Sequence, residues 1–563
     1  MIKRFAYLLV AVLALSACST DLGDIEDRIK KVEEQGKDLE SKHNQLVSES
    51  DRLKQESATL SEEVKKRQEE NEKIRQQLQD FEASVSDPKL ISLEFIAADN
   101  PLQLIDNVKC DIIGDSVAEC RILNITSSKE LIPRFTFQGS VVTINGVEVK
   151  SGDTKIDFSR PVVLSVITAK KIKDYTVYVN AYTRLPTVWL ETSDHKDVTK
   201  AEQYYNGKIK VTGNLTTSAK SLITHGNVKF MALGKLLWYK SRIHSDEQLG
   251  KNTFSLLFDR DFSLLDSPEG NTWKLYTNAA DKTMLHNRMG YYLGEISSLD
   301  YTPRFHHVNL MLNGRYFGTY LLGEEIEASE GRVDVGADGF VLGVGSTASG
   351  PTFKTTYLEN AVGIVAPSAS QSAEAVNYVS DYVTRAENAL FSLSYTDAEQ
   401  GWQQYLDIDS FVDWYLVNEI AKNENATFKR DCMMNLKRGG KLKMGPLWDF
   451  ESAFGTGSGS TGFVVKNVLW YARLFQDPAF VSRVKQRYNY YYSHKYDIIN
   501  EINTTAQYLK YAIQEDNNKW ETFTDTPNSG EEAWSLYQKS VYDMEVWLSD
   551  RMDWLKGQFD AMA

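Results

Sequence analysis

Three features are missing from this sequence of 563 residues, and each narrows the choice of function. Basic residues are not in excess: 63 Lys and Arg stand against 77 Asp and Glu, and the net charge of −14 argues against broad nucleic-acid binding, which requires a basic face. Beyond the N-terminus there is no run of 18 apolar residues, so we expect no membrane-spanning helix. Internal repeats are also missing, while 42% apolar residues suffice for several buried cores.

The N-terminus has the pattern of a secretory signal. Lys3 and Arg4 precede an apolar run, and small residues lead to Cys18. A cysteine at this place resembles a bacterial lipoprotein signal, whose thiol is acylated, and several acyl chains anchor a protein stably. We therefore expect residues 1–17 to be a signal peptide and Cys18 to be lipidated, with a short buried helix as the alternative. The acidic residues at 21–27 resemble the surface-export signal of Bacteroidetes lipoproteins, which indicates the outer membrane or cell surface.

Cysteine is scarce in the rest of the chain, where only Cys110, Cys120 and Cys432 occur. The segment "VKCDIIGDSVAEC" predicts a hairpin that would bring Cys110 and Cys120 close together, and an exported compartment permits a disulfide. A register slip of one residue would put the two side chains on opposite faces, so the paired and unpaired states both remain open. Cys432 is expected to be a packed thiol.

Residues 22–85 contain no proline and are dense in Glu, Lys, Gln and Arg. A heptad register places apolar residues on one seam position, which are Ile25, Val32, Leu39, Leu46, Leu53, Leu60, Ile74 and Phe81. The second seam position is partly polar. This pattern predicts a self-associating coiled-coil stalk within residues 18–87, about 95 Å long. The alternative is a solvated helix that folds back on the body.

Between residues 88 and 192 the apolar period changes to two, in short β-branched and aromatic runs separated by turn residues. This predicts a β-sandwich, and the segment from Leu131 to Ala181 resembles the Ig-like modules of Bacteroidetes surface proteins, which usually serve as spacers. Residues 193–563 are mixed, with strands to about Val344 and helices after it, so we expect an α+β domain. The stretch "GTGSGSTG" at 455–462 predicts a mobile loop.

Several motifs of this last region resemble the spore-coat-protein-H (CotH) family, whose fold is an atypical protein-kinase-like one. They occur in the family's order: "DKTMLHNRMGYYLGE" at 281–295, "YTPRFHHVNLMLNGRYFGTYLLGEEIE" at 301–327, "DIDSFVDWYLVNEIAKNENA" at 407–426, "GKLKMGPLWDFESAFG" at 440–455 and "WYARLFQDPAFVSRVKQRY" at 470–488. The ordered set predicts a CotH kinase-like domain.

The resemblance implies phosphoryl transfer, which needs a cation near the nucleotide phosphates, carboxylates that hold a metal ion, and a base near the acceptor. Asp449 and Glu451 would hold Mg²⁺, with Glu451 in place of the family's second aspartate. Lys251 and Glu324 would contact ATP. Asn425 stands where the family has its catalytic aspartate.

Other positions depart from the family's pattern. The amide of Asn425 cannot take a proton at neutral pH. Gly343 and Gly345 replace two acidic residues of a strand, and an Arg-Gly-Asn-Ser-Thr-Trp run is reduced to "LGKLLW" at 233–238. Asp431 is either a substitute base or part of a solvated turn.

These observations leave three hypotheses. The first is an envelope-anchored lipoprotein whose CotH head is degenerate, a pseudokinase-like binding or scaffolding module with a protein or glycan ligand. The second is an active exported kinase that uses ATP and Mg²⁺. The third is a structural envelope protein assembled by its stalk.

Overall fold

A computed structural model describes residues 22–85, 87–104, 107–122, 128–181, 183–212, 224–234, 238–240, 247–358, 360–367, 371–429, 431–524 and 529–562. The predicted signal peptide and the lipidation site Cys18 lie outside these residues. The chain divides into two compact units, of which one contains the N-terminal helix and residues 168–171 and the other contains 88–167 and 172–563. Among the described helices, none combines the length and the apolar character that crossing a membrane requires.

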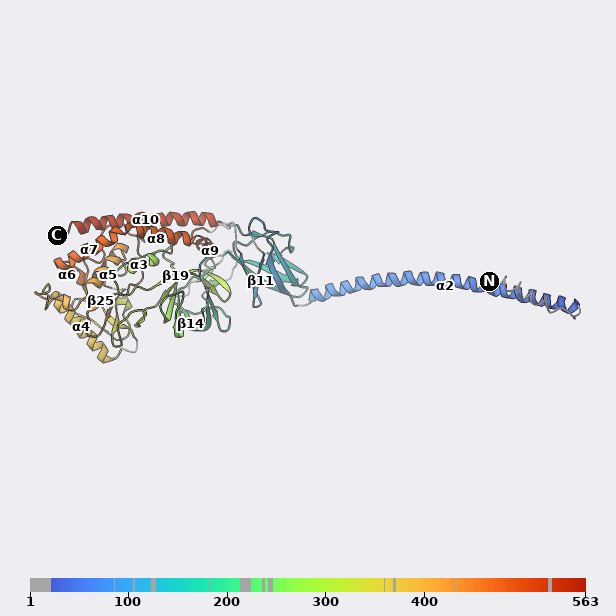
Figure 1. Ribbon diagram of the computed structural model, residues 1–563, viewed down its shortest axis with the longest axis horizontal. Helices are drawn as coiled ribbons and strands as arrows, with labels where there is room; N and C mark the ends of the chain where they lie inside the picture. Colours follow the sequence, from blue (N-terminus) through green and yellow to red (C-terminus); the bar gives the residue numbers. More distant parts are fainter. Residues whose placement is uncertain are drawn as a thin grey trace. The chain divides into compact units, whose positions relative to one another are not determined.

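The first unit is dominated by one helix, α2 (Leu22–Val85), of 64 residues (Figure 1). Its surface carries ion pairs one turn apart, such as Lys42 with Asp38 at 2.8 Å, which stabilise an isolated helix modestly. The predicted seam is exposed in the single chain: Leu46 is 66% exposed and Leu60 is 60% exposed. The prediction of a long helix is therefore confirmed, whereas its assembly into a coiled coil stays a prediction.

The second unit begins with a β-rich module of two main sheets around one apolar core. The three-stranded sheet has the order β2-β1-β6, and the six-stranded sheet has the order β3-β4-β11-β10-β7-β8. The strands are β1 (Lys89–Phe95), β2 (Val108–Lys109), β3 (Asp111–Ile113), β4 (Val117–Ile122), β6 (Pro133–Gln138), β7 (Val141–Ile144), β8 (Val147–Glu148), β10 (Val162–Ile167) and β11 (Ile172–Ala181), with β5 (Glu130–Leu131) pairing β9 (Ile156–Asp157). The region is β-rich as predicted, and its Ig-like character stays a prediction.

The hairpin of β3 and β4 carries the two cysteines of this module. Ile113 pairs with Val117 next to the turn, and Asp111 pairs with Glu119 at the open end. This register places Cys110 opposite Cys120, and the two are joined by a disulfide with a Cα–Cα distance of 4.4 Å. Of the two states left open by the sequence, the structure has the paired one.

A closed barrel follows, with the strand order β12-β13-β14-β17-β18-β20-β19. Its strands are β12 (Thr187–Thr192), β13 (Tyr205–Thr212), β14 (Thr224–Ala232), β17 (Phe254–Phe262), β18 (Gly270–Tyr276), β19 (Phe305–Leu312) and β20 (Arg315–Glu324), and β15 (Trp238–Lys240) pairs separately with β16 (Glu247–Leu249). β12 closes the barrel through parallel pairing with β19. β12, which falls within the residues 88–192 predicted for the β-sandwich, therefore pairs with strands of the barrel, and the predicted domain boundary itself stays a prediction.

A second sheet and a helical layer complete this domain. The sheet has the order β22-β23-β21-β24-β25. Its strands are β21 (Phe340–Val344), β22 (Thr352–Phe353), β23 (Val362–Ala366), β24 (Cys432–Leu436) and β25 (Leu442–Met444). The helices are α3 (His286–Glu295), α4 (Ala373–Phe391), α5 (Ile408–Ala421), α6 (Leu469–Leu474), α7 (Pro478–Ser493), α8 (Lys495–Tyr508), α9 (Lys510–Trp520) and α10 (Gly530–Asp560), with short 3-10 turns η1 (Gly345–Thr347) and η3 (Trp402–Gln404). Figure 1 shows α10 running along α8 and α9.

Local sequence determines where several of these helices begin. The side chains of Ser372, Asp407 and Asp477 accept hydrogen bonds from the first-turn amides of α4, α5 and α7, which lack partners inside the helix. Pro478 occupies the start of α7, where its missing N–H costs nothing. α5 is almost completely buried, with both apolar and charged side chains inside the domain, and α3, α7 and α10 pack against it.

Candidate functional site

The candidate site is built around the turn that follows β25, which contains Asp449. Asp449 has a left-handed backbone with φ 39°, and its Oδ1 accepts a hydrogen bond from the amide of Glu451 at 3.0 Å. Its carbonyl oxygen accepts from Nδ2 of Asn423 at 2.8 Å, and the Phe450 amide donates to Oδ1 of Asn287 at 2.8 Å. The turn is therefore held by three sets of contacts, which come from the Asp449 side chain, from the loop after α5 and from α3.

α3 approaches this turn closely because it carries two glycines one turn apart. A Cβ on Gly290 would lie 2.2 Å from the ring of Phe450, and a Cβ on Gly294 would lie 2.5 Å from Leu447. Residues four apart share one face of a helix, so the two glycines form a flat surface for the turn. The motif at 281–295 thus positions Asp449 through its small residues.

The acidic start of the same motif reaches the turn as well. Asp281 is buried, and its Oδ2 accepts from the His286 amide at 2.7 Å. The Nδ1 of His286 lies 3.0 Å from the Glu451 carbonyl oxygen, while Oε1 of Glu451 accepts from the Ala280 amide at 2.8 Å. The structure therefore brings Asp281 and Glu451 together beside Asp449, although the sequence reasoning had assigned no role to Asp281.

Several carboxyl groups lie close together around the Asp449 turn. Burial raises the pKa of Glu451, and the neighbouring charges of Asp449 and Asp281 raise it further. Burial also raises the pKa of Tyr291, with Asp449 as the largest electrostatic cause. A divalent cation would relieve this repulsion, so the carboxylates of Asp449 and Glu451 suit the Mg²⁺ role that the sequence predicts.

The geometry is not that of a complete protein-only metal site. Within the described residues, no group of three or more His, Cys, Asp or Glu side chains could hold a metal ion. Mg²⁺ in phosphoryl-transfer sites often takes only one or two carboxylates, with water and phosphate oxygens as its other ligands. Asp449 and Glu451 would therefore supply only part of a ligand set, and a bound nucleotide would have to complete it.

A lysine that the sequence analysis overlooked lies next to this turn. Nζ of Lys274, on β18, is 2.7 Å from Oε1 of Glu325 and 5.1 Å from the ring centre of Trp448. Burial raises the pKa of Tyr276, and the charges of Glu325 and Asp449 add to the effect, so both carboxylates are near one phenol. The sequence signal was the alternation of Trp273, Lys274 and Leu275, which directs the lysine away from the barrel core.

Lys251, the predicted nucleotide-binding lysine, lies elsewhere. Its Nζ is 2.7 Å from Oδ1 of Asp516 on α9, and the same oxygen accepts from the Thr319 amide at 2.8 Å. Thr319 and Glu324 are both on β20, and a strand rises about 3.3 Å per residue, so Thr319 lies about 17 Å before Glu324. The structure therefore does not bring Lys251 together with Glu324.

Glu324 is buried and points away from Lys274. It accepts a hydrogen bond from the hydroxyl of Tyr301, and burial raises its pKa while the charge of Arg332 opposes that shift. Successive residues of a strand face opposite sides, so the acid that meets Lys274 is Glu325, the neighbour of the predicted residue.

The two candidates for the base occupy different places. The backbone amide of Asn425 donates to Oδ1 of Asn423 at 3.3 Å. The side-chain amide of Asn423 in turn donates to the Asp449 carbonyl oxygen, so the segment of Asn425 is linked to the turn through Asn423. Asp431 directly precedes β24, and its carboxylate accepts a hydrogen bond from the Ser346 hydroxyl in η1. The structure therefore links Asn425 to the turn and Asp431 to the edge of the second sheet.

Comparison with known proteins decides the family. The model of the family described as "CotH kinase protein" matches residues 242–555, more than half of the chain. The chain belongs to the CotH family. The match contains the Asp449 turn, Lys274 and the helices that surround them.

No curated protein matches the chain. Among solved structures, a provisionally assigned glycoside hydrolase from Bacteroides thetaiotaomicron is 18% identical, with a TM-score of 0.16, over 31% of this chain and 46% of that one. A DUF4623 family protein from Bacteroides eggerthii is 12% identical, with a TM-score of 0.12, over 34% of this chain and 58% of that one. The chain thus spans about half the length of each.

The Gly-Ser loop of the CotH domain is held in place. Nη1 of Arg551 donates to the carbonyl oxygens of Ser460 at 3.0 Å and Gly462 at 2.7 Å, and Nε1 of Trp547 donates to that of Ser458 at 3.0 Å. Arg551 is itself buried and paired with Glu419 at 2.9 Å. The loop at 455–462 is therefore hydrogen-bonded to α10, and its predicted mobility stays a prediction.

Proposed function

We propose that this CotH domain is a kinase-like binding head in which phosphoryl transfer is lost or strongly reduced. The observation that carries the proposal is Asn425, an amide at the position where the family resemblance places an aspartate base. Asn423, two residues before Asn425, donates to the carbonyl oxygen of Asp449, which supports a position of this segment near the expected reaction centre. Asp431, the alternative acid, is bonded to Ser346 at the edge of the second sheet.

The active kinase is the second candidate, and one observation favours it. Lys274 and Glu325 form an ion pair beside Trp448 and Asp449, which resembles the lysine–glutamate pair that protein kinases use at the nucleotide phosphates. Positioning and electrostatic stabilisation supply most of the rate of phosphoryl transfer, so the loss of a base alone need not abolish it. In this candidate Asp449 and Glu451 hold Mg²⁺, which neutralises phosphate charge.

One experiment separates these candidates. ATP is titrated into the full-length protein with and without Mg²⁺ in a calorimeter, and transfer of labelled phosphate to the protein and to casein is measured in parallel. The pseudokinase-like head predicts no transfer, whether or not ATP binds. Transfer that disappears in Asp449→Asn would establish the kinase and overturn the proposal.

The cellular setting is part of the proposal. The N-terminal pattern supports acylation at Cys18, and the exposed apolar seam of α2 supports self-association as a stalk that carries the head from the outer membrane. Cys18→Ser is expected to move the protein from the membrane fraction to the soluble fraction, and an unchanged distribution would argue against the lipid anchor. A protein whose stalk assembly is its whole function remains the third candidate.

A further inference from the structure

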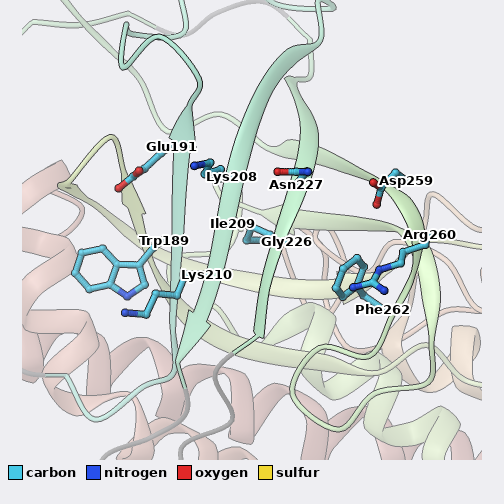
Figure 2. Close-up of a pocket in the computed structure, with 10 residues that line it drawn as sticks. All are labelled: Trp189, Glu191, Lys208, Ile209, Lys210, Gly226, Asn227, Asp259, Arg260 and Phe262. Atoms are coloured by element: carbon cyan, nitrogen blue, oxygen red, sulfur yellow. The ribbon is translucent and has the colours of Figure 1, made fainter.

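A groove of about 790 Å³ lies on one face of the barrel, over β12, β13, β14 and β17 (Figure 2). Strand alternation identifies this as the outer face: Ile209 and Val211 are buried in the barrel core, whereas Lys208 and Lys210 are exposed. The contacts that hold the Asp449 turn come from other elements. The groove is therefore separate from the kinase-like site, and its occupancy can be tested independently.

The charged side chains of the groove are not paired with one another. Glu191 and Lys208 stand opposite each other on β12 and β13, where opposite charges ordinarily attract. Neither residue forms an ion pair within the part of the chain that the structure describes, and the same holds for Lys210, Asp259 and Arg260. Among the described residues, these three cations and two acids thus have no ion-pair partner, although the guanidinium of Arg260 lies 4.7 Å from the centre of the Phe262 ring; their net charge is positive in a protein whose net charge is −14.

The groove also has apolar surfaces at its two ends. Ile209 and Gly226 pair in its floor, with their side-chain positions toward the barrel core, and Phe262 lines the β17 end of the groove while also packing against that core. Trp189 stands on β12 at the opposite side, as Figure 2 shows, and the guanidinium of Arg121 lies over its ring at 4.8 Å from the ring centre. β12 and β17 are three strand spacings apart, which is about 14 Å. An elongated ligand can therefore contact both aromatic rings.

We propose that this groove binds an acidic oligosaccharide. Sugar rings have apolar faces, which can pack against the exposed parts of the Trp189 and Phe262 side chains at the two ends. Their hydroxyl groups donate to carboxylates and amides, which Glu191, Asp259 and Asn227 supply between them. The carboxylate or sulfate groups of the saccharide pair with Lys208, Lys210 and Arg260.

The mixture of charges distinguishes this ligand from other polyanions. A nucleic-acid groove neutralises a regular phosphate backbone with cations alone, and two carboxylates among three cations oppose that. A neutral saccharide would leave the three cations without partners. An acidic saccharide uses both kinds of group, because it carries hydroxyl donors as well as anionic acceptors.

The test uses the full-length protein and three defined probes: a galacturonate trisaccharide, a sulfated trisaccharide of neutral sugars, and an unsulfated neutral trisaccharide. Calorimetry gives the affinity, and tryptophan fluorescence reports contact with Trp189. We expect one or both acidic probes to bind more tightly than the neutral probe, and the two acidic arms show whether carboxylate or sulfate is preferred. Added salt is expected to weaken binding because the groove is exposed.

The double variant Lys208→Gln/Lys210→Gln is expected to weaken binding by about tenfold, since each exposed charge contact contributes modestly. Both side chains are exposed and make no ion pair in the described structure, so the fold should be unaffected. The matched control is Lys229→Gln, an exposed lysine of β14 outside the groove, which should bind as the wild type does. No binding of either acidic probe at millimolar concentration would overturn the proposal, as would equal binding of the neutral probe or of an acidic peptide.

Discussion

Nζ of Lys274 lies 2.7 Å from Oε1 of Glu325, directly beside the Asp449 turn of the CotH domain. The two side chains are 13% and 21% exposed. Lys251 forms its ion pair with Asp516, which is only 2% exposed, and therefore holds α9 against the barrel. The two lysines are equally exposed, at 13%, and differ in their partners: that of Lys274 is 21% exposed and lies beside the Asp449 turn, whereas that of Lys251 is buried.

This difference predicts opposite effects of two equivalent substitutions. Lys274→Met is expected to lower any affinity for ATP and Mg²⁺ by about tenfold, because a charge-assisted contact to phosphate is lost, with little change in stability. Lys251→Met is expected to leave that affinity unchanged and to destabilise the fold by about 3 kcal/mol, because it leaves Asp516 charged and buried. Calorimetry and thermal unfolding measure the two effects, and the reverse pattern would refute the assignment.

Divalent-cation binding at the Asp449 turn is expected to depend on pH. Burial and the charges of Asp449 and Asp281 raise the pKa of Glu451, so this carboxyl takes up a proton at a higher pH than an ordinary glutamate. Mg²⁺ affinity should therefore fall as the pH is lowered, and the fall should begin at a higher pH than for an ordinary glutamate. Glu451→Gln should remove that dependence together with part of the affinity, whereas Asp431→Asn should change neither.

Gly290 should tolerate no side chain. In Gly290→Ala the new Cβ would meet the Phe450 ring at 2.2 Å, and we expect a loss of about 2 kcal/mol in the free energy of unfolding. The control is Gly557→Ala in α10, where nothing lies within 4 Å of the new Cβ, and a gain of about 0.5 kcal/mol is expected from helix propensity. Chemical denaturation measures both, and equal effects would contradict the packing described.

The junction between the β-rich module and the CotH domain should be sensitive to pH. Burial raises the pKa of Glu119 to about 7, so the native state keeps a proton that the unfolded chain loses near its ordinary value of 4.5. The free energy of unfolding should therefore fall by about 3 kcal/mol as the pH rises from 4.5 through 7. Glu119→Gln should flatten this slope, and Glu130→Gln, which is exposed, should not.

Lys519, in the same junction, should have the opposite effect on how stability changes with pH. Burial lowers its pKa to about 8, so between pH 8 and its ordinary value of 10.5 the unfolded chain binds the extra proton. Stability should increase with pH over that interval, and Lys519→Met should remove the increase. Thermal unfolding across pH 5 to 10 tests both residues in one series.

The exposed seam of α2 predicts self-association. The full-length chain should sediment as an oligomer, and a chain that lacks residues 22–85 should sediment as a monomer, because Leu46, Leu53 and the other seam residues remain bare in one chain. Leu46→Lys combined with Leu53→Lys should reduce the oligomer, whereas an exposed substitution off the seam, Glu49→Lys, should have little effect. A monomeric full-length chain at high concentration would exclude the coiled coil.

The amino-acid sequence alone determined the features that depend on neighbours within the chain. The absence of proline and the local charge pairs of residues 22–85 make a long helix, and Ser372, Asp407 and Asp477 mark helix starts. The ordered motifs between 281 and 488 predicted the CotH family, and the segment 440–455 led to the predictions for Asp449 and Glu451. These features are short-range, so pattern and spacing can predict them.

Tertiary structure decided which groups meet across the sheets. β12 belongs to the barrel because it pairs with β19, more than a hundred residues later. Glu325 rather than Glu324 meets Lys274, because the pairing register of β18 with β20 sets which face of the sheet each acid occupies. A shift of one residue reverses the face of every side chain in a strand. That register arises from packing over the whole domain, and no local pattern around Lys251, Lys274 or the two glutamates could have revealed it.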